Sequence, residues 1–453
     1  MGTDEVWELD ATAQAARIAA GDIGPHDAVE EALERIDRID PEINSVVCTF
    51  PERTSAEHVE AAIARGAPFA GVPTLLKDAG QELAGTRYGV GLSVLHDIEH
   101  RSTRTTPFAE HLERLGFVII GKCASAELAT GNTTEPPGLD PTRNPWDLER
   151  TVGGSSGGTA ASVAAGLVPV AHGSDHTGSL RYPASACGAV TLKPTKGRVE
   201  STGVGDIVTT FAANMDFVIA RSVRDLAGVL PCAIAPAKER AVRLLDVSQH
   251  AQPHLDPACR AAVERAGEAA ESLGHDVDVV SLPELEALRD LMVDFDLVTG
   301  WLRARTKEWL TVVLGREVVP SDMPAELYEV ALSGASVTDA EADEAGHRIR
   351  SALDPYVTAM RTIDVLITPT LLQPAWHLGI EKSARNSGAF PVPSSITGQP
   401  AMSIPLHHDA DRNLPVGVHL VGNLGSDEQL LSFASELEEH SSWAGRWPEL
   451  AKE

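Results

Sequence analysis

The stretch TVGGSSGGTAASVAAG, residues 151–166, places two adjacent serines between two pairs of glycines and then continues into an alanine-rich segment. Glycine-rich turns that open a helix bring backbone N–H groups and hydroxyls close to a bound group, because little side chain stands in the way. Three interpretations of this loop are open: a phosphate-binding loop, a nucleophile elbow, or a structural turn whose small residues let a helix pack against a strand.

The residues around the glycines separate these interpretations. A phosphate-binding loop requires Lys-Ser or Lys-Thr after its last glycine, whereas Thr159 and Ala160 follow Gly158. A nucleophile elbow, G-x-S-x-G, is present as residues 154–158 with Ser156 as the nucleophile, and that fold also requires an acid and a histidine downstream. For the loop taken alone, the structural turn is the favoured interpretation.

On both sides of the loop, short apolar runs alternate with helix-forming sequence, as in GVPTLLKD (71–78) and GFVIIGK (116–122). Such alternation predicts an α/β fold in which helices cover a sheet. We expect one domain over residues 1–453. Its predicted parts are an N-terminal helical segment (1–66), a catalytic core (67–230), a helical insertion (256–361) and a C-terminal return to the sheet (362–453).

The composition restricts the partners and the compartment. The formal net charge of −28 repels nucleic acid and anionic membranes, and no apolar run is long enough to cross a bilayer. The start of the chain, MGTDEVWELD, lacks the basic and then apolar pattern of a secretory signal, so we expect a cytoplasmic protein. Five scattered cysteines without a CxxC pair predict reduced thiols and no zinc site.

Two further segments carry groups that could act with the serines of the loop. Lys77 ends an apolar run, and Ser179 lies in a second glycine-rich turn, GSDHTGSLRYPASACG (173–188). A lysine in dry surroundings can be neutral near physiological pH and act as a base, and a serine hydroxyl needs such a base to become a good nucleophile. Two serines and one lysine therefore suggest a proton relay that uses no histidine.

Together these segments resemble the amidase signature family, which hydrolyses carboxamides and some esters through a Ser–cis-Ser–Lys triad. The resemblance implies a mixed β-sheet core covered by α-helices on both faces, and we expect no cofactor and no metal. The segments TTEPPG (133–138) and TRNPW (142–146) are similar to those of the 6-aminohexanoate cyclic-dimer hydrolase subgroup. The matching segments, in family order, are GVPTLLKD, RNPWDLERTVGGSSGG, GSDHTGSLRYPASACG, LKPTKGR, ARSVRD, DVLITPT, TGQPAMSIP and LPVGVHLVG.

The resemblance also implies a role for each residue that matches the family motifs. Ser179 matches the nucleophile that forms the acyl-enzyme, Ser155 the relay whose peptide bond is cis, and Lys77 the base. Backbone N–H groups of the second turn are implied to hold the negative charge of the tetrahedral intermediate. These oxyanion donors are expected to be His176, Thr177, Gly178 and Ser179.

Other residues of these motifs are expected to support the site. Thr177 replaces a glycine of the common D-T-G-G-S pattern, which restricts the backbone and narrows the pocket. Tyr182 is expected to line the substrate pocket. The residues expected to hold the turn without reacting are Asp78, Ser156, Asp175 and Arg181.

Three functions agree with these motifs. The first is the hydrolysis of a small carboxamide. The second is an acyltransferase or amide synthase that passes the same acyl-enzyme to an amine or alcohol. The third is an accessory subunit of an amidotransferase complex. Because members of the family often pair, we also expect a homodimer.

Overall fold

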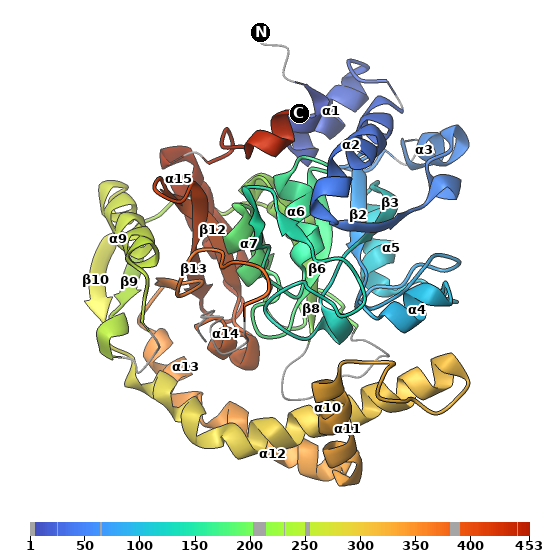
Figure 1. Cartoon of the computed structure of the whole chain (residues 1–453). Helices are drawn as coiled ribbons and strands as arrows, with labels where there is room; N and C mark the ends of the chain where they lie inside the picture. Colours follow the sequence, from blue (N-terminus) through green and yellow to red (C-terminus); the bar gives the residue numbers. More distant parts are fainter. Residues whose placement is uncertain are drawn as a thin grey trace.

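The computed structural model describes residues 5–24, 26–63, 66–202, 214–230, 232–249, 254–380, 390–441 and 443–453. Its centre is an 11-stranded sheet with the strand order β1-β3-β2-β6-β8-β7-β12-β13-β11-β9-β10 (Figure 1). The strands of this sheet are β1 (Val46–Thr49), β2 (Pro73–Lys77), β3 (Val118–Cys123), β6 (Val170–Asp175), β7 (Val190–Lys193), β8 (Met215–Ala220), β9 (Ala241–Leu245), β10 (Asp276–Val280), β11 (Val365–Pro369), β12 (Ala401–Asp409) and β13 (Leu414–Gly422). A small separate hairpin consists of β4 (Arg143–Asn144) and β5 (Asp147–Thr151).

The sheet is mixed, as expected. Strand β2 runs parallel to β3 and β6, and β9 runs parallel to β10 and β11, whereas the other pairs are antiparallel. All residues of β2, β3 and β6 are buried. Strands that are covered on both faces typically read as continuous apolar runs, and β3 begins with such a run. Strand β6 differs, since it also buries His172, Ser174 and Asp175.

Helices cover both faces of the sheet, which confirms the predicted fold class (Figure 1). Helices α6 and α7 pack against each other, and α15 packs against both α8 and α9. The α-helices are α1 (Ala11–Ala20), α2 (Asp27–Ile43), α3 (Ala56–Ile63), α4 (Ser93–Asp97), α5 (Pro107–Arg114), α6 (Gly157–Ala164), α7 (Arg181–Cys187), α8 (Val223–Val229), α9 (Pro257–Ser272), α10 (Met292–Leu314), α11 (Ala325–Ser333), α12 (Asp339–Ser351), α13 (Asp354–Met360), α14 (Val392–Thr397) and α15 (Asp427–His440).

The segment 256–361 is mostly helical, but it also contributes strand β10 to one edge of the sheet. The sequence of β10, DVDVV, alternates apolar and charged residues, which suits a half-exposed edge strand. Further along this segment, α10 extends for 23 residues below the sheet (Figure 1). Val298 of α10 belongs to the same apolar cluster as Tyr356, whereas Leu310 belongs to a second cluster that contains Tyr88. Helix α10 therefore connects two separate parts of the core.

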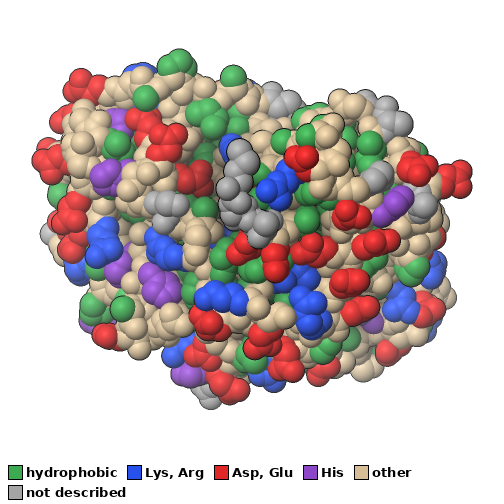
Figure 2. All heavy atoms as spheres, turned by 90° about the horizontal axis from the view of Figure 1, so that it is seen from above, with side chains coloured by type: hydrophobic (Ala, Val, Ile, Leu, Met, Phe, Trp, Pro, Cys, Tyr) green, Lys and Arg blue, Asp and Glu red, His purple; other side chains and the backbone are tan. Residues whose placement is uncertain are grey.

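Acidic side chains are spread over the face that Figure 2 shows, with basic side chains among them. None of the helices in the described ranges combines the length and the apolar character needed to cross a membrane.

Candidate active site

The position of Lys77 follows from the pairing of two parallel strands. Thr74 and Leu75 of β2 pair with Val170 and Ala171 of β6, so the carboxyl ends of both strands lie at the same edge of the sheet. Ligands bind at this edge in open α/β sheets. Lys77 is the last residue of β2, and its Nζ donates a hydrogen bond of 2.9 Å to Oγ of Ser174 at the end of β6.

The glycine–serine loop brings Ser155 to the same lysine. The Nζ of Lys77 donates a 2.8 Å hydrogen bond to Oγ of Ser155, and the Gly154–Ser155 peptide bond is cis. A Cβ atom on Gly154 would lie 2.6 Å from the backbone of Thr133, and one on Gly158 would lie 2.5 Å from that of Ala124. These glycines are therefore required because the loop passes in direct contact with neighbouring backbone.

Ser179 lies in the second turn, just before α7. The N–H of Ser156 donates to the carbonyl oxygen of Ser179 at 3.2 Å, which joins the two serine-bearing turns. The Oγ of Ser156 also donates to the carbonyl oxygen of Ser174. Lys77 and Ser155 are fully buried, whereas Ser179 is 8% exposed. Ser179 is thus the member of the predicted triad that an external molecule can reach.

Burial changes the acid–base behaviour of Lys77. Removal from water disfavours the ammonium form and lowers the pKa of Lys77 to about 7, although the negative charges of Asp216 and Asp175 act in the opposite direction. At this pKa a large fraction of Lys77 is neutral at physiological pH. A neutral lysine that contacts a serine hydroxyl can accept a proton from it.

Asp175 and Arg181 hold the second turn in place. Their side chains form a fully buried ion pair of 2.9 Å, and the guanidinium holds the pKa of Asp175 well below its usual range. Asp175 also accepts the N–H of Gly178 at 2.7 Å. One of the four expected oxyanion donors is therefore already engaged within the turn. Among the described residues, the N–H groups of Thr177 and Ser179 donate to no protein acceptor.

The remaining expected site residues lie around this centre. Asp78 accepts the N–H of Gly89 at 2.9 Å and pairs with Nε2 of His96, so its carboxylate faces the loop before α4 and not Ser155. The ring of Tyr182 covers Gly178 closely enough that a Cβ there would lie 2.4 Å away. Thr177 does not have a positive φ, so its side chain strains no backbone.

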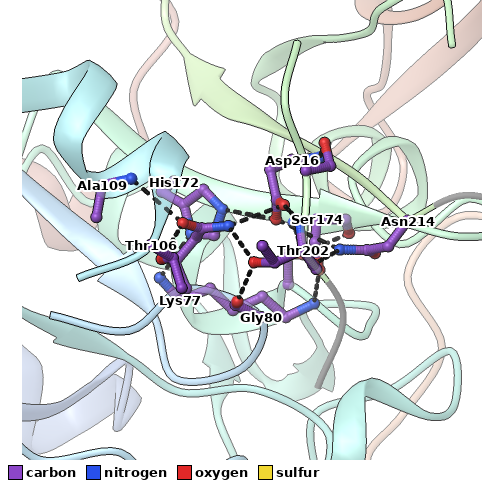
Figure 3. A network of polar contacts seen from close by, with 12 residues as sticks. Lys77, Gly80, Thr106, Ala109, His172, Ser174, Thr202, Asn214 and Asp216 are labelled. Atoms are coloured by element: carbon purple, nitrogen blue, oxygen red, sulfur yellow. Dashed lines mark hydrogen bonds and ion pairs between the residues drawn. The ribbon is translucent and has the colours of Figure 1, made fainter. Parts of the chain in front are cut away.

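The structure adds a polar network around Lys77 that the sequence motifs do not reveal (Figure 3). The backbone N–H of Lys77 donates to Nδ1 of His172, so Nε2 of His172 carries the proton and donates to Asp216 at 3.2 Å. Asp216 also accepts hydrogen bonds of 2.9 Å from Gln81 and from the N–H of Thr202. Asp216 lies 139 positions after Lys77 in the sequence, and only the pairing of β6 with β8 places them together.

Comparison with known proteins assigns the fold and these motifs to a class of amide hydrolases. The amidase family model matches residues 27–431. The chain therefore belongs to the amidase family, which confirms the resemblance indicated by the motifs.

Individual relatives agree with this assignment over nearly their whole length. The chain is 33% identical to 6-aminohexanoate-cyclic-dimer hydrolase from Paenarthrobacter ureafaciens, covering 99% of this chain and 98% of the relative. It is 32% identical to a glutamyl-tRNA(Gln) amidotransferase subunit from Gloeobacter violaceus, covering 96% and 97% of the two chains. A solved structure of 6-aminohexanoate cyclic dimer hydrolase complexed with substrate superimposes with a TM-score of 0.86 at 32% identity, covering 99% of this chain and 100% of that one. The similarity to this subgroup is thereby confirmed.

Proposed function

We propose that the protein hydrolyses a carboxamide bond in a small molecule through an acyl-enzyme on Ser179, with Ser155 as the proton relay and Lys77 as the base. The observation that carries this proposal is the buried contact of 2.8 Å between Nζ of Lys77 and Oγ of Ser155. Burial lowers the pKa of this lysine to about 7, which favours proton transfer at neutral pH.

In the first half of the reaction, Oγ of Ser179 attacks the amide carbonyl. Its proton passes to Ser155, while the proton of Ser155 passes to neutral Lys77. The tetrahedral intermediate then breaks its C–N bond, and the proton returns from Lys77 through Ser155 to the leaving amine. The product amine departs, and the acyl group stays on Ser179 as an ester.

In the second half, water attacks the ester carbonyl and gives its proton through the same relay. The ester bond breaks, the carboxylic acid leaves, and Ser179 regains its proton. The N–H groups of Thr177 and Ser179 are suited to stabilise the oxyanion in both halves, since they donate to no acceptor in the described chain. Loss of one such donor typically lowers kcat by about 10²–10³-fold.

Linear and cyclic amides of 6-aminohexanoate are the first substrates to test, because two relatives with 6-aminohexanoate-cyclic-dimer hydrolase in their names share 33% identity with the chain. The test is the release of free amine by the purified single chain, for the wild type and for Ser179→Ala. We expect hydrolysis by the wild type and a loss of about 10³-fold or more in the variant, since nucleophile and base act as a unit.

Two outcomes of the same assay would favour the alternatives. If added hydroxylamine or a primary alcohol captures the acyl group while water does not, the protein is an acyltransferase. If the single chain is inactive on all amides and Ser179 stays unreactive, an accessory role in an amidotransferase complex becomes the better interpretation. The second alternative is motivated by the 32% identity to the glutamyl-tRNA(Gln) amidotransferase subunit.

A further inference from the structure

Arg303 occupies the middle of α10, between the two apolar clusters that hold this helix. Val298 lies in the cluster on one side, and Leu310 lies in the cluster on the other side together with Ala79, two residues after Lys77. Residues seven positions apart lie on the same face of an α-helix. Arg303 therefore shares the face of Leu310, which is the face that α10 turns toward the end of β2.

Among the described residues, the guanidinium of Arg303 has no counterion. It forms no hydrogen bond or ion pair within these ranges, and its Nε is shielded from solvent without an acceptor. Burial lowers the pKa of Arg303 to about 10, and no acidic group of the described part of the chain offsets this effect. Arg305, two residues further on, pairs with both Glu308 and Asp339. In a chain with 65 acidic and 37 basic residues, a half-buried arginine that meets no acidic partner in the described ranges requires an explanation.

The charge of Arg303 reaches the turn that carries Ser179. His176 lies three residues before Ser179. Both His176 and Thr177 are half-buried, whereas the residues on either side of them in the turn are buried. Burial, and after it the positive charge of Arg303, lowers the pKa of His176 to about 4. His176 is therefore neutral at physiological pH. Arg303 therefore places a positive charge near this turn.

A buried charge without a partner is unfavourable, and an anionic ligand would compensate it. The guanidinium presents several N–H donors in a rigid planar fork that matches the two oxygens of a carboxylate. We propose that Arg303 binds a carboxylate group of the substrate, so that the preferred substrates are amides that carry a free carboxylate. This inference rests on the proposed amide hydrolysis at Ser179 and narrows its substrate class.

The test compares two amides that differ only in charge. One is the linear dimer of 6-aminohexanoate, and the other is the same molecule with its terminal carboxylate replaced by a methyl group. Both are measured with the wild type, Arg303→Met, Arg303→Lys and the control Arg305→Met, which removes a paired arginine from the same helix. Protection of Ser179 from a fluorophosphonate by hexanoate or by hexanamide provides a second readout that needs no turnover.

We expect the wild type to prefer the carboxylate substrate and Arg303→Met to lose about 10- to 100-fold in kcat/KM for it, mainly through KM. The methyl analogue should be hydrolysed equally well by both proteins, Arg303→Lys should lie between them, and Arg305→Met should change neither substrate. Hexanoate should protect Ser179 better than hexanamide only when Arg303 is present.

Equal losses for both substrates in Arg303→Met, or no loss for either, would overturn the inference, as would equal protection by hexanoate and hexanamide in the wild type. In these cases Ser179 still reacts with the fluorophosphonate, and the proposed hydrolysis stands. A wild-type protein whose Ser179 does not react at all would overturn the proposed function and this inference with it.

Discussion

At the scale of single residues, the proposed relay makes the reaction depend on the protonation of Lys77. Burial favours the neutral amine, while the charges of Asp216 and Asp175 favour the ammonium ion, and the balance places the pKa at about 7. Only the neutral form can accept a proton from Ser155. If Lys77 is the base, as we propose, activity should rise with pH as Lys77 loses its proton.

The pH dependence of kcat/KM provides a direct test of this balance. We expect an acidic limb whose midpoint lies at about 7 in the wild type. In Asp216→Asn one of the two negative charges that raise the pKa of Lys77 is gone, so the midpoint should move to lower pH. Glu110→Gln, on the exposed side of α5 and paired with Arg114, is the control and should leave the midpoint unchanged. A midpoint that moves upward in Asp216→Asn would contradict the assignment of Lys77 as the base.

The sequence predicted some residues of this site more readily than others. Lys77, Ser155 and Ser179 stand in motifs with local signals, namely an apolar run that ends in lysine and two glycine-rich turns. The hydroxyl of Ser174 also accepts a hydrogen bond from Lys77. Ser174 lies within the segment 173–188, but no local sequence pattern distinguishes it from its neighbours. Asp216 could not be predicted as a neighbour, because its contact with His172 depends on the order of the strands.

At the scale of secondary-structure elements, α10 depends on a very close approach to the next helical segment. Gly334, the first residue of the short helix η7 (Gly334–Ser336), lies so near α10 that an added Cβ would be 2.0 Å from the carbonyl oxygen of Gly300. Because α10 also carries Arg303, this contact helps to set where the guanidinium lies. The helical pattern of the sequence predicted α10, but not the path that it takes between the two apolar clusters.

Gly334→Ala should therefore destabilise the fold and displace α10. Overpacking of this kind costs about 1–3 kcal/mol in the free energy of unfolding, which denaturant titration can measure. The variant should also lose part of the preference for carboxylate substrates. Gly445→Ala is the matched control, since a Cβ at Gly445 meets no atom within 4 Å. Equal stability of the two variants would show that the contact between Gly300 and Gly334 does not constrain α10.

At the scale of the whole molecule, the site is built from segments that are far apart in the chain. Arg181 pairs with Asp175 beside the turn that carries Ser179 and also donates to Oγ of Ser394 at 2.8 Å and Oγ of Ser395 at 2.7 Å, more than 200 residues further on. The return of the chain to the sheet at strand β11 could be predicted, because this strand begins with the apolar run VLI (365–367). The pairing of Arg181 with α14 could not, because no local pattern encodes a contact over this separation.

Mass-spectrometric mapping of a fluorophosphonate adduct on the purified protein, repeated with Lys77→Ala, would decide whether the proposed relay operates. We predict an adduct on Ser179 in the wild type and a large loss of labelling without Lys77, since Ser155 then has no base. An adduct on Ser156 would contradict the relay and favour a nucleophile elbow. Full labelling of Ser179 in Lys77→Ala would likewise contradict the role of Lys77 as the base.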